Sequence, residues 1–174
     1  MIMNIGVISD IHDNKYNLRK VLQELKQKDI EQLILLGDSN SPFIVKEICE
    51  TLQIPIIFVW GNNDGDKVVI TQTINSHHKD SVVSSQCFLS VEINGRQLFL
   101  THFPELAHIA VKSQQFDSVM YGHNHLKHSC EEGKTLLLNP GAIYANNELA
   151  SYAVYNTQTN TAEIFEIEDS KRSD

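Results

Sequence analysis

Short apolar runs that end abruptly in polar residues recur along the chain. The first run, residues 4–8, is followed by Ser9 and then by Asp10 and His12. Short apolar runs bounded in this way are typical of buried strands. Four later runs, at residues 33–36, 54–60, 98–101 and 118–121, also end in carboxylate, amide or imidazole side chains. The pattern predicts five strands whose ends carry polar groups.

Apolar residues repeat at helical spacing between the first three strands. Asp13 and Asn14 are alternative N-caps of the first helix, and Ser41 with Pro42 begins the second. The apolar stripes are Leu18, Val21, Leu22 and Leu25 in the first helix, and Val45, Ile48, Cys49 and Leu52 in the second. This β-α-β-α-β order predicts a parallel sheet.

The pattern changes beyond residue 65. It predicts a short helix over 66–74, a hairpin over 86–101 that turns at Asn94 and Gly95, and a final hairpin over 151–167. A helix from Pro104 is expected to bury Leu106, Ile109 and Ala110. We therefore expect an α/β fold in which two mixed β-sheets pack face to face with helices outside. Residues 1–168 would form a single domain, and residues 169–174 a frayed charged tail.

Composition limits the classes of partner. The 174 residues carry a formal charge of −8, which disfavours binding to nucleic acid or to an anionic membrane. No apolar run is long enough to span a bilayer and no secretory signal opens the chain, so the expected location is cytoplasmic. The three cysteines are widely spaced, which suits neither a disulfide framework nor a cysteine-based zinc site. A homo-oligomer is compatible with these features.

The polar strand ends have two interpretations. For the first strand alone, Asp10 as a helix cap with His12 on the surface fits as well as a pair of metal ligands. Recurrence at five strand ends favours the ligands, because the carboxyl ends of parallel strands meet at one crevice. Mixed oxygen and imidazole donors suit manganese, iron, nickel or zinc better than calcium.

The ordered set Asp-x-His, Gly-Asp, Gly-Asn-Asn-Asp, His and Gly-His-x-His resembles the calcineurin-like metallophosphoesterase superfamily. The short chain and the Asn-Pro-Gly-Ala segment at 139–142 are similar to its small bacterial and archaeal phosphodiesterase branch. The resemblance implies two divalent metal ions, with manganese the first expectation. One ion would be held by Asp10, His12, Asp38 and His125, and the other by Asp38, Asn62, His102 and His123. Asp38 could bridge both, because one carboxylate can span cations roughly 3.5–4 Å apart.

The resemblance also implies the reaction, which is hydrolysis of a small phosphoester, with a phosphodiester favoured over a monoester. A metal-bound water, whose pKa falls from about 15.7 toward ~7, would attack phosphorus without a covalent enzyme intermediate. Asn63 occupies a position where many members have histidine, and it cannot protonate a leaving group, so His12 or a water would have to help. Asp64 and Asp13 either orient the ligands or serve as cap and turn residues.

Two other functions fit parts of the sequence. A scaffold that keeps the fold and binds a protein partner, as the related retromer subunit does, would be expected to lack ligands, whereas here the set is complete. A nuclease is disfavoured because the chain is acidic and shows no basic stripe.

Overall fold

The computed structural model describes residues 3–145 and 148–171 of the chain. These residues form helices and strands in the order β1 Asn4–Ile8, α1 Lys15–Leu25, β2 Gln32–Leu35, α2 Pro42–Thr51, β3 Ile56–Phe58, α3 Lys67–His77, β4 Val82–Val83, β5 Phe88–Ile93, β6 Arg96–Thr101, α4 Pro104–Ser113, β7 Ser118–Met120, β8 His128–Glu132, β9 Thr135–Asn139, β10 Ser151–Asn156 and β11 Thr161–Glu166. None of the helices in this part of the chain is long and apolar enough to cross a membrane.

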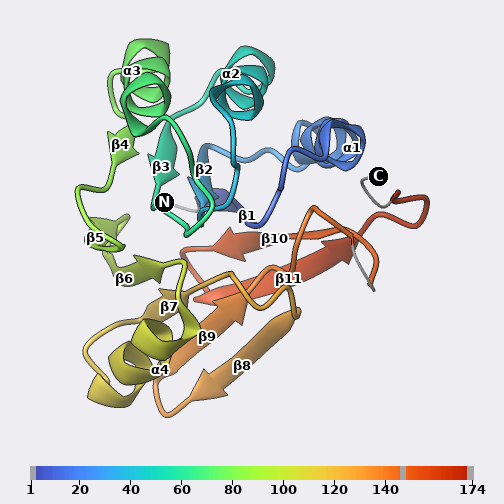
Figure 1. Cartoon of the computed structure of the whole chain (residues 1–174). Coiled ribbons are helices and arrows are strands. Elements are labelled where there is room, and N and C mark those ends of the chain that lie inside the picture. Colours follow the sequence, from blue (N-terminus) through green and yellow to red (C-terminus); the bar gives the residue numbers. More distant parts are fainter. Residues whose placement is uncertain (1–2, 146–147, 172–174) are drawn as a thin grey trace.

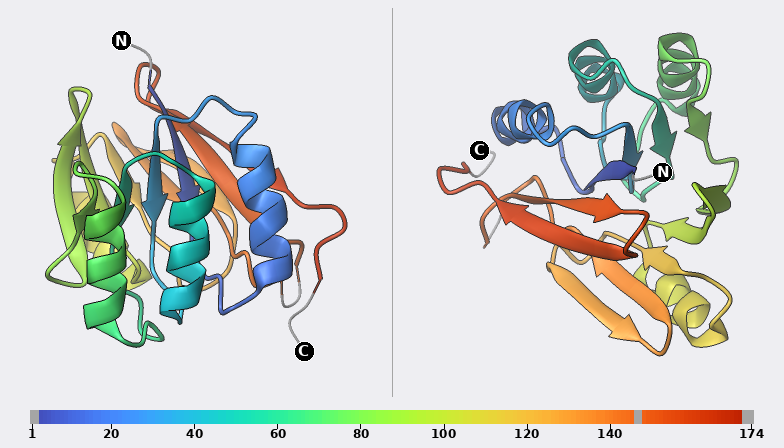
Figure 2. Two further views of the ribbon diagram at one scale, coloured as in Figure 1. Left: turned by 90° about the horizontal axis from the view of Figure 1, so that it is seen from above. Right: turned by 180° about the vertical axis from the view of Figure 1, so that it is seen from behind.

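The first sheet has the strand order β11-β10-β1-β2-β3-β4, and β1, β2 and β3 run parallel as the sequence predicted. Figure 1 shows α1, α2 and α3 on its outer face, and the left view of Figure 2 shows these three helices side by side. Both predicted apolar stripes are buried in the core that these helices share with the sheet. Asn14, rather than Asp13, caps α1 by accepting a hydrogen bond from the backbone N–H of Asn17.

The second sheet has the strand order β5-β6-β7-β9-β8, with β6, β7 and β9 parallel and an antiparallel strand at each side. The predicted hairpin turn is confirmed, since Asn94 and Gly95 both have positive φ (51° and 80°) as a primed turn requires. Helix α4 covers the opposite side of the molecule from α1–α3 (Figure 1).

The prediction for the buried face of α4 is wrong at two of three positions. Ala110 is buried, but Leu106 is only half-buried and Ile109 is 69% exposed. Ala107 and Val111 take the inward positions instead. Small side chains on this face let the helix lie close against the sheet, so the larger residues turn outward.

The inner faces of the two sheets share one apolar core. Ile5 and Val7 of β1 pack in the same cluster as Leu98 and Leu100 of β6 and Met120 of β7. Because both faces of β1–β3 are covered, these strands are apolar at nearly every position. The predicted fold class, an α/β arrangement of two packed mixed sheets with helices outside, is confirmed.

Three features of the fold were not predicted. The short strand β4 and the edge strand β8 lack the apolar runs of the central strands. The final hairpin, β10–β11, pairs antiparallel with β1 and so completes the first sheet. Part of the predicted tail is attached to α1, because the carbonyl of Lys171 accepts hydrogen bonds from the side chains of Asn14 and Asn17. Residues 172–174 of that tail lie outside the described residues.

Candidate metal centre

Backbone hydrogen bonds join the loops that follow the central strands. The N–H of Asp10 donates to the carbonyl of Gly37 (3.1 Å), and the N–H groups of Ile11 and His12 donate to the carbonyl of Asp38 (2.8 and 3.0 Å). In the second sheet, Gly122 N–H donates to the carbonyl of His102 (3.2 Å). These bonds connect the loop after β1 to the loop after β2, and the loop after β7 to the end of β6.

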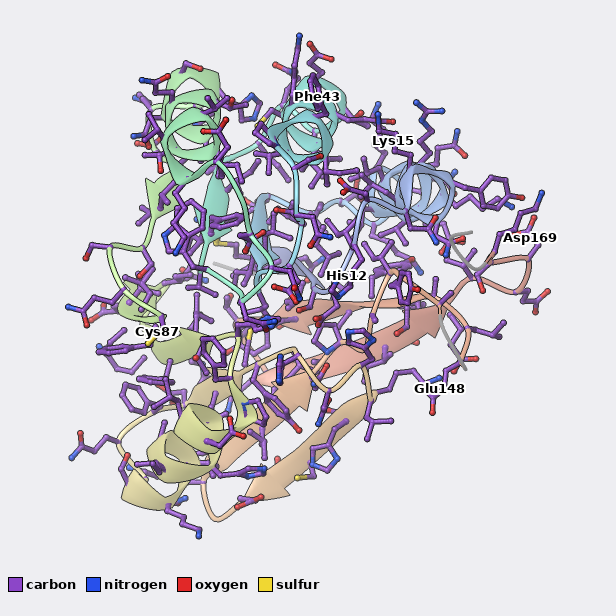
Figure 3. The ribbon with its side chains drawn as sticks, viewed as in Figure 1. His12, Lys15, Phe43, Cys87, Glu148 and Asp169 are labelled. Carbon is purple, nitrogen blue, oxygen red and sulfur yellow. The ribbon has the colours of Figure 1, made fainter. Side chains whose placement is uncertain are left out.

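The predicted ligands form two clusters near the centre of the molecule, where Figure 3 labels His12. In the first cluster, Asp10 Oδ1 lies 3.3 Å from His125 Nε2 and 3.7 Å from His12 Nε2. The two imidazole nitrogens face each other at 3.2 Å. The three ligand atoms all lie within 4.8 Å of one another, which is a suitable spacing for one metal ion.

The second cluster centres on His102. Its Nε2 lies 3.1 Å from His123 Nδ1, 3.1 Å from Asn62 Oδ1 and 3.4 Å from Asp38 Oδ2. The same Oδ2 of Asp38 lies 3.6 Å from His12 Nε2, which belongs to the first cluster. One carboxylate oxygen therefore faces both clusters, and the structure brings all seven predicted ligands together.

Charges in the centre shift the pKa values of four ligands. Burial alone would raise the pKa of Asp10, but His12, His125 and His102 outweigh it and lower that pKa well below its usual range. Burial also opposes ionisation of Asp38, whose pKa is nevertheless lowered by His102 and by hydrogen bonds from Asn63. The centre therefore holds two ionised carboxylates.

The same attraction acts on two histidines. Burial disfavours the charged form of His102, yet Asp38 and Asp10 raise its pKa. A contact with Asp10 raises the pKa of His125 despite partial burial. These shifts show that the carboxylates stabilise positive charge placed between them.

The chemistry of the donor set fits a divalent cation. Asp10 Oδ2 accepts hydrogen bonds from the Ser9 hydroxyl (2.6 Å) and the His123 N–H (2.9 Å), whereas its buried Oδ1 accepts none from the described residues. His102 Nδ1–H donates to the Leu36 carbonyl (2.8 Å), which directs the lone pair of Nε2 into the centre. A carboxylate oxygen without a donor and a fixed imidazole lone pair are groups that a metal ion would satisfy.

Most of the clustered residues have left-handed backbone geometry. Positive φ values between 46° and 74° occur at Asp10, His12, Asp38, His123 and His125. Non-glycine residues seldom adopt this geometry, and such strain concentrates at functional sites. His123 and His125 reach different clusters from this left-handed backbone.

Asn63 and Asp64 contact the centre in different ways. Asn63 donates to both oxygens of Asp38, from its N–H to Oδ1 (2.8 Å) and from its side-chain amide to Oδ2 (2.7 Å). Asp64 is buried and accepts five hydrogen bonds of 2.8 to 3.1 Å. The donors are the Ser39 hydroxyl and the backbone N–H groups of Asp38, Ser39, Asn40 and Gly61. The hydrogen-bond donors to Asp64 are thus groups of the loops after β2 and β3 rather than the imidazoles.

Comparison with known proteins identifies the family. Residues 3–160, most of the chain, match the calcineurin-like phosphoesterase superfamily domain. The chain belongs to the calcineurin-like phosphoesterase superfamily. The resemblance inferred from the motifs is confirmed.

This calcineurin-like phosphoesterase is 35% identical over 141 residues to the phosphodiesterase MJ0936 of Methanocaldococcus jannaschii, an alignment that covers 80% of this chain and 83% of the relative. The structure of this chain is similar to that of an archaeal phosphodiesterase, with a TM-score of 0.88 and 30% identity over 95% of this chain and 100% of the other. Yfce, a phosphoesterase from E. coli, shares the fold with a TM-score of 0.69 and 21% identity, over 97% of this chain and 96% of its own.

Two glycines of this calcineurin-like phosphoesterase lie directly against ligands. A Cβ on Gly61 would collide with Oδ1 of Asp38, and a Cβ on Gly122 would collide with the Ser9 hydroxyl and approach Asp10 Oδ2. Glycine at these positions lets the loop backbone approach the carboxylates closely. Both glycines directly precede predicted ligands in the sequence, Gly61 before Asn62 and Gly122 before His123.

Sequence reasoning missed two supporting residues. Asn139, the first residue of the Asn-Pro-Gly-Ala segment, is buried and donates to the Gly122 carbonyl (3.2 Å) and to Asn124 Oδ1 (2.9 Å). It thereby holds the loop that carries His123 and His125. The ring of Tyr144 packs against His12 with 5.3 Å between ring centroids. Asn139 lies in a motif that the sequence displayed, whereas nothing near Tyr144 in the sequence indicated its position.

Proposed function

We propose that the protein hydrolyses small phosphodiesters with two divalent metal ions bound at the described centre, and that no covalent enzyme intermediate forms. The observation that carries this proposal is the position of Asp38 between the two clusters. When bound, the ions would lower the pKa of a water and neutralise charge on the phosphoryl oxygens.

The chain's own residues would bind the two metal ions and keep the ligands in position. Asp10, His12 and His125 would hold one ion, Asn62, His102 and His123 the other, and Asp38 both. Each of these side chains offers a lone pair and is of a type that binds metal ions. Because the attacking group would be a water, the proposal requires no nucleophile from the chain. The loop contacts of Asp64 and the hydrogen bonds from Asn63 to Asp38 would keep the shared carboxylate in place.

Protonation of the leaving group is the step for which this centre is least equipped. The amide of Asn63 has no acidic proton and already donates to Asp38. His12 directs Nε2 toward Asp10 and Asp38, and an imidazole that binds a metal through this atom cannot also donate a proton from it. We therefore assign His12 to the metal and expect the best substrates to be esters whose leaving groups need little protonation. The similarity to a phosphodiesterase supports a diester substrate.

Substitution of Asp38 tests the proposal. Asp38→Ala should abolish hydrolysis of bis-(4-nitrophenyl) phosphate in Mn²⁺ and should lower the metal content of the purified protein. The matched control is Asp80→Ala, which removes an exposed carboxylate outside the centre and should change neither quantity. Turnover by the Asp38→Ala variant equal to that of the unmodified protein would contradict the proposal. An unmodified protein that binds no metal and hydrolyses no ester would favour the scaffold alternative.

A further inference from the structure

A pocket of about 200 Å³ lies beside the first cluster of ligands. One wall consists of Asn124, His125 and Leu126, from the loop between β7 and β8. The other wall consists of Ala142, Ala145, Glu148 and Leu149, which follow β9 in the chain. His125 belongs both to this pocket and to the first cluster of proposed ligands, so the pocket lies directly beside the candidate metal centre. We call this space the His125 pocket.

Both walls of the His125 pocket are hydrogen-bonded to groups that position the ligands. Ile143 N–H donates to the carbonyl of Ser9 (3.2 Å), and Tyr144 N–H donates to the carbonyl of Asp10 (2.9 Å). On the other side, Asn139 donates to Asn124 Oδ1. The pocket is therefore held in a fixed relation to the centre, as a substrate subsite must be.

Four of the seven lining residues in the described part of the chain are aliphatic, and the other three are Asn124, His125 and Glu148. Leu126 is 54% exposed and Leu149 is 39% exposed, while Ala142 and Ala145 are small and buried. Partly exposed leucines that line the same pocket can cover an apolar group and gain by its burial.

The charge at the outer side of the pocket is negative. Glu148 also lines the pocket, and Figure 3 shows it further toward the periphery than His12. Its carboxylate lies 3.1 Å from Lys127 Nζ, but the same ammonium lies 2.5 Å from Glu166. Two carboxylates thus share one positive charge, and no lysine or arginine is among the described lining residues. A second anionic group on a ligand would be repelled here.

We propose that the His125 pocket binds the organic group of the phosphoester and selects for a small, uncharged and apolar group, such as a single aromatic ring or a short alkyl chain. The volume lies below the roughly 300–1,000 Å³ of pockets that hold drug-sized ligands, so it suits one ring and not a whole nucleotide. This inference rests on the proposed function, because it assumes that the phosphoryl group binds at the metal centre.

Binding of phosphonates tests the inference without catalysis, because their carbon–phosphorus bond is not hydrolysed. Titration calorimetry on the zinc-loaded protein would compare phenylphosphonate with methylphosphonate. Burial of the ring predicts about tenfold tighter binding of the phenyl compound. The double variant Leu126→Ala/Leu149→Ala should reduce this ratio to about twofold. Ile109→Ala, which truncates an exposed aliphatic residue on α4, is the matched control and should keep the ratio.

Charge selection is tested with 4-carboxyphenylphosphonate. Glu148→Gln should tighten its binding several-fold while leaving phenylphosphonate within about twofold of its original affinity. Equal affinities of the phenyl and methyl compounds in the unmodified protein, or an unchanged ratio in the leucine double variant, would overturn the pocket assignment alone. If neither phosphonate bound to the zinc-loaded protein, the proposed phosphoryl site would fail as well.

Discussion

Asn63 donates two hydrogen bonds to Asp38, one from its backbone and one from its side-chain amide. The first would persist with any residue at this position, whereas the second depends on asparagine. The motif comparison expects a histidine here in many members of the superfamily. Asn63 therefore holds the carboxylate of Asp38 in place, but it has no acidic proton to donate to a leaving group.

Asn63→His should therefore change the substrate preference. We expect the rate for an alkyl ester, a poor leaving group, to rise about 10²-fold relative to the rate for a nitrophenyl ester, which is the lower end of what a general acid contributes. Initial rates for methyl 4-nitrophenyl phosphate and dimethyl phosphate in Mn²⁺ would measure the effect. An identical change for both substrates would remove the argument that a proton donor is missing.

At the scale of elements, Asp64 joins the loop after β2 to the loop after β3. Asp64→Ala leaves five donors without their acceptor, and each unsatisfied buried donor costs about 1–3 kcal/mol before water and local relaxation compensate. We expect the free energy of unfolding to fall by about 3 kcal/mol or more. Urea denaturation would measure it, with Asp80→Ala expected to stay within about 0.5 kcal/mol as a surface control.

An Asp64→Ala variant with unchanged stability and reduced metal content would contradict this assignment, because it would place Asp64 among the ligands.

The buried face of helix α2 can be tested for accessibility to a thiol reagent, because it carries Cys49. Cys49 lies on the buried face of α2, and burial raises the pKa of its thiol to about 11. At pH 8 the reactive thiolate is then on the order of 10⁻³ of the total. Iodoacetamide should modify exposed Cys87 in the native protein and should reach Cys49 only after denaturation, as peptide mass spectrometry would show. Equal labelling of both cysteines would show that α2 does not stay packed.

The elements differ in how far the sequence predicts them. Strands β1–β3 lie between two apolar layers, so their sequences are continuous apolar runs with clear ends. Edge strand β8 has a mostly exposed, polar sequence and gains its position from pairing with β9. The inward face of α4 was mispredicted because hydrophobicity alone favours Ile109 over Ala107, whereas close contact with a sheet favours the smaller residue.

At the scale of the whole molecule, the candidate metal centre was predictable because its residues follow strands that run parallel within each of the two packed sheets. The left-handed backbone of Asp10, His12 and Asp38 was not, since it results from hydrogen bonds between loops that are distant in sequence. For the same reason the sequence indicated neither the position of Tyr144 nor the His125 pocket, both of which depend on the return of the chain from β9 to β10.

The account depends most on the claim that two ions share Asp38. Crystals grown with Mn²⁺ and measured for anomalous scattering would locate the ions directly. We predict two peaks per chain, roughly 3.5–4 Å apart, one beside Asp10, His12 and His125 and one beside Asn62, His102 and His123, with Asp38 between them. A single peak, or two peaks that Asp38 does not join, would contradict the account.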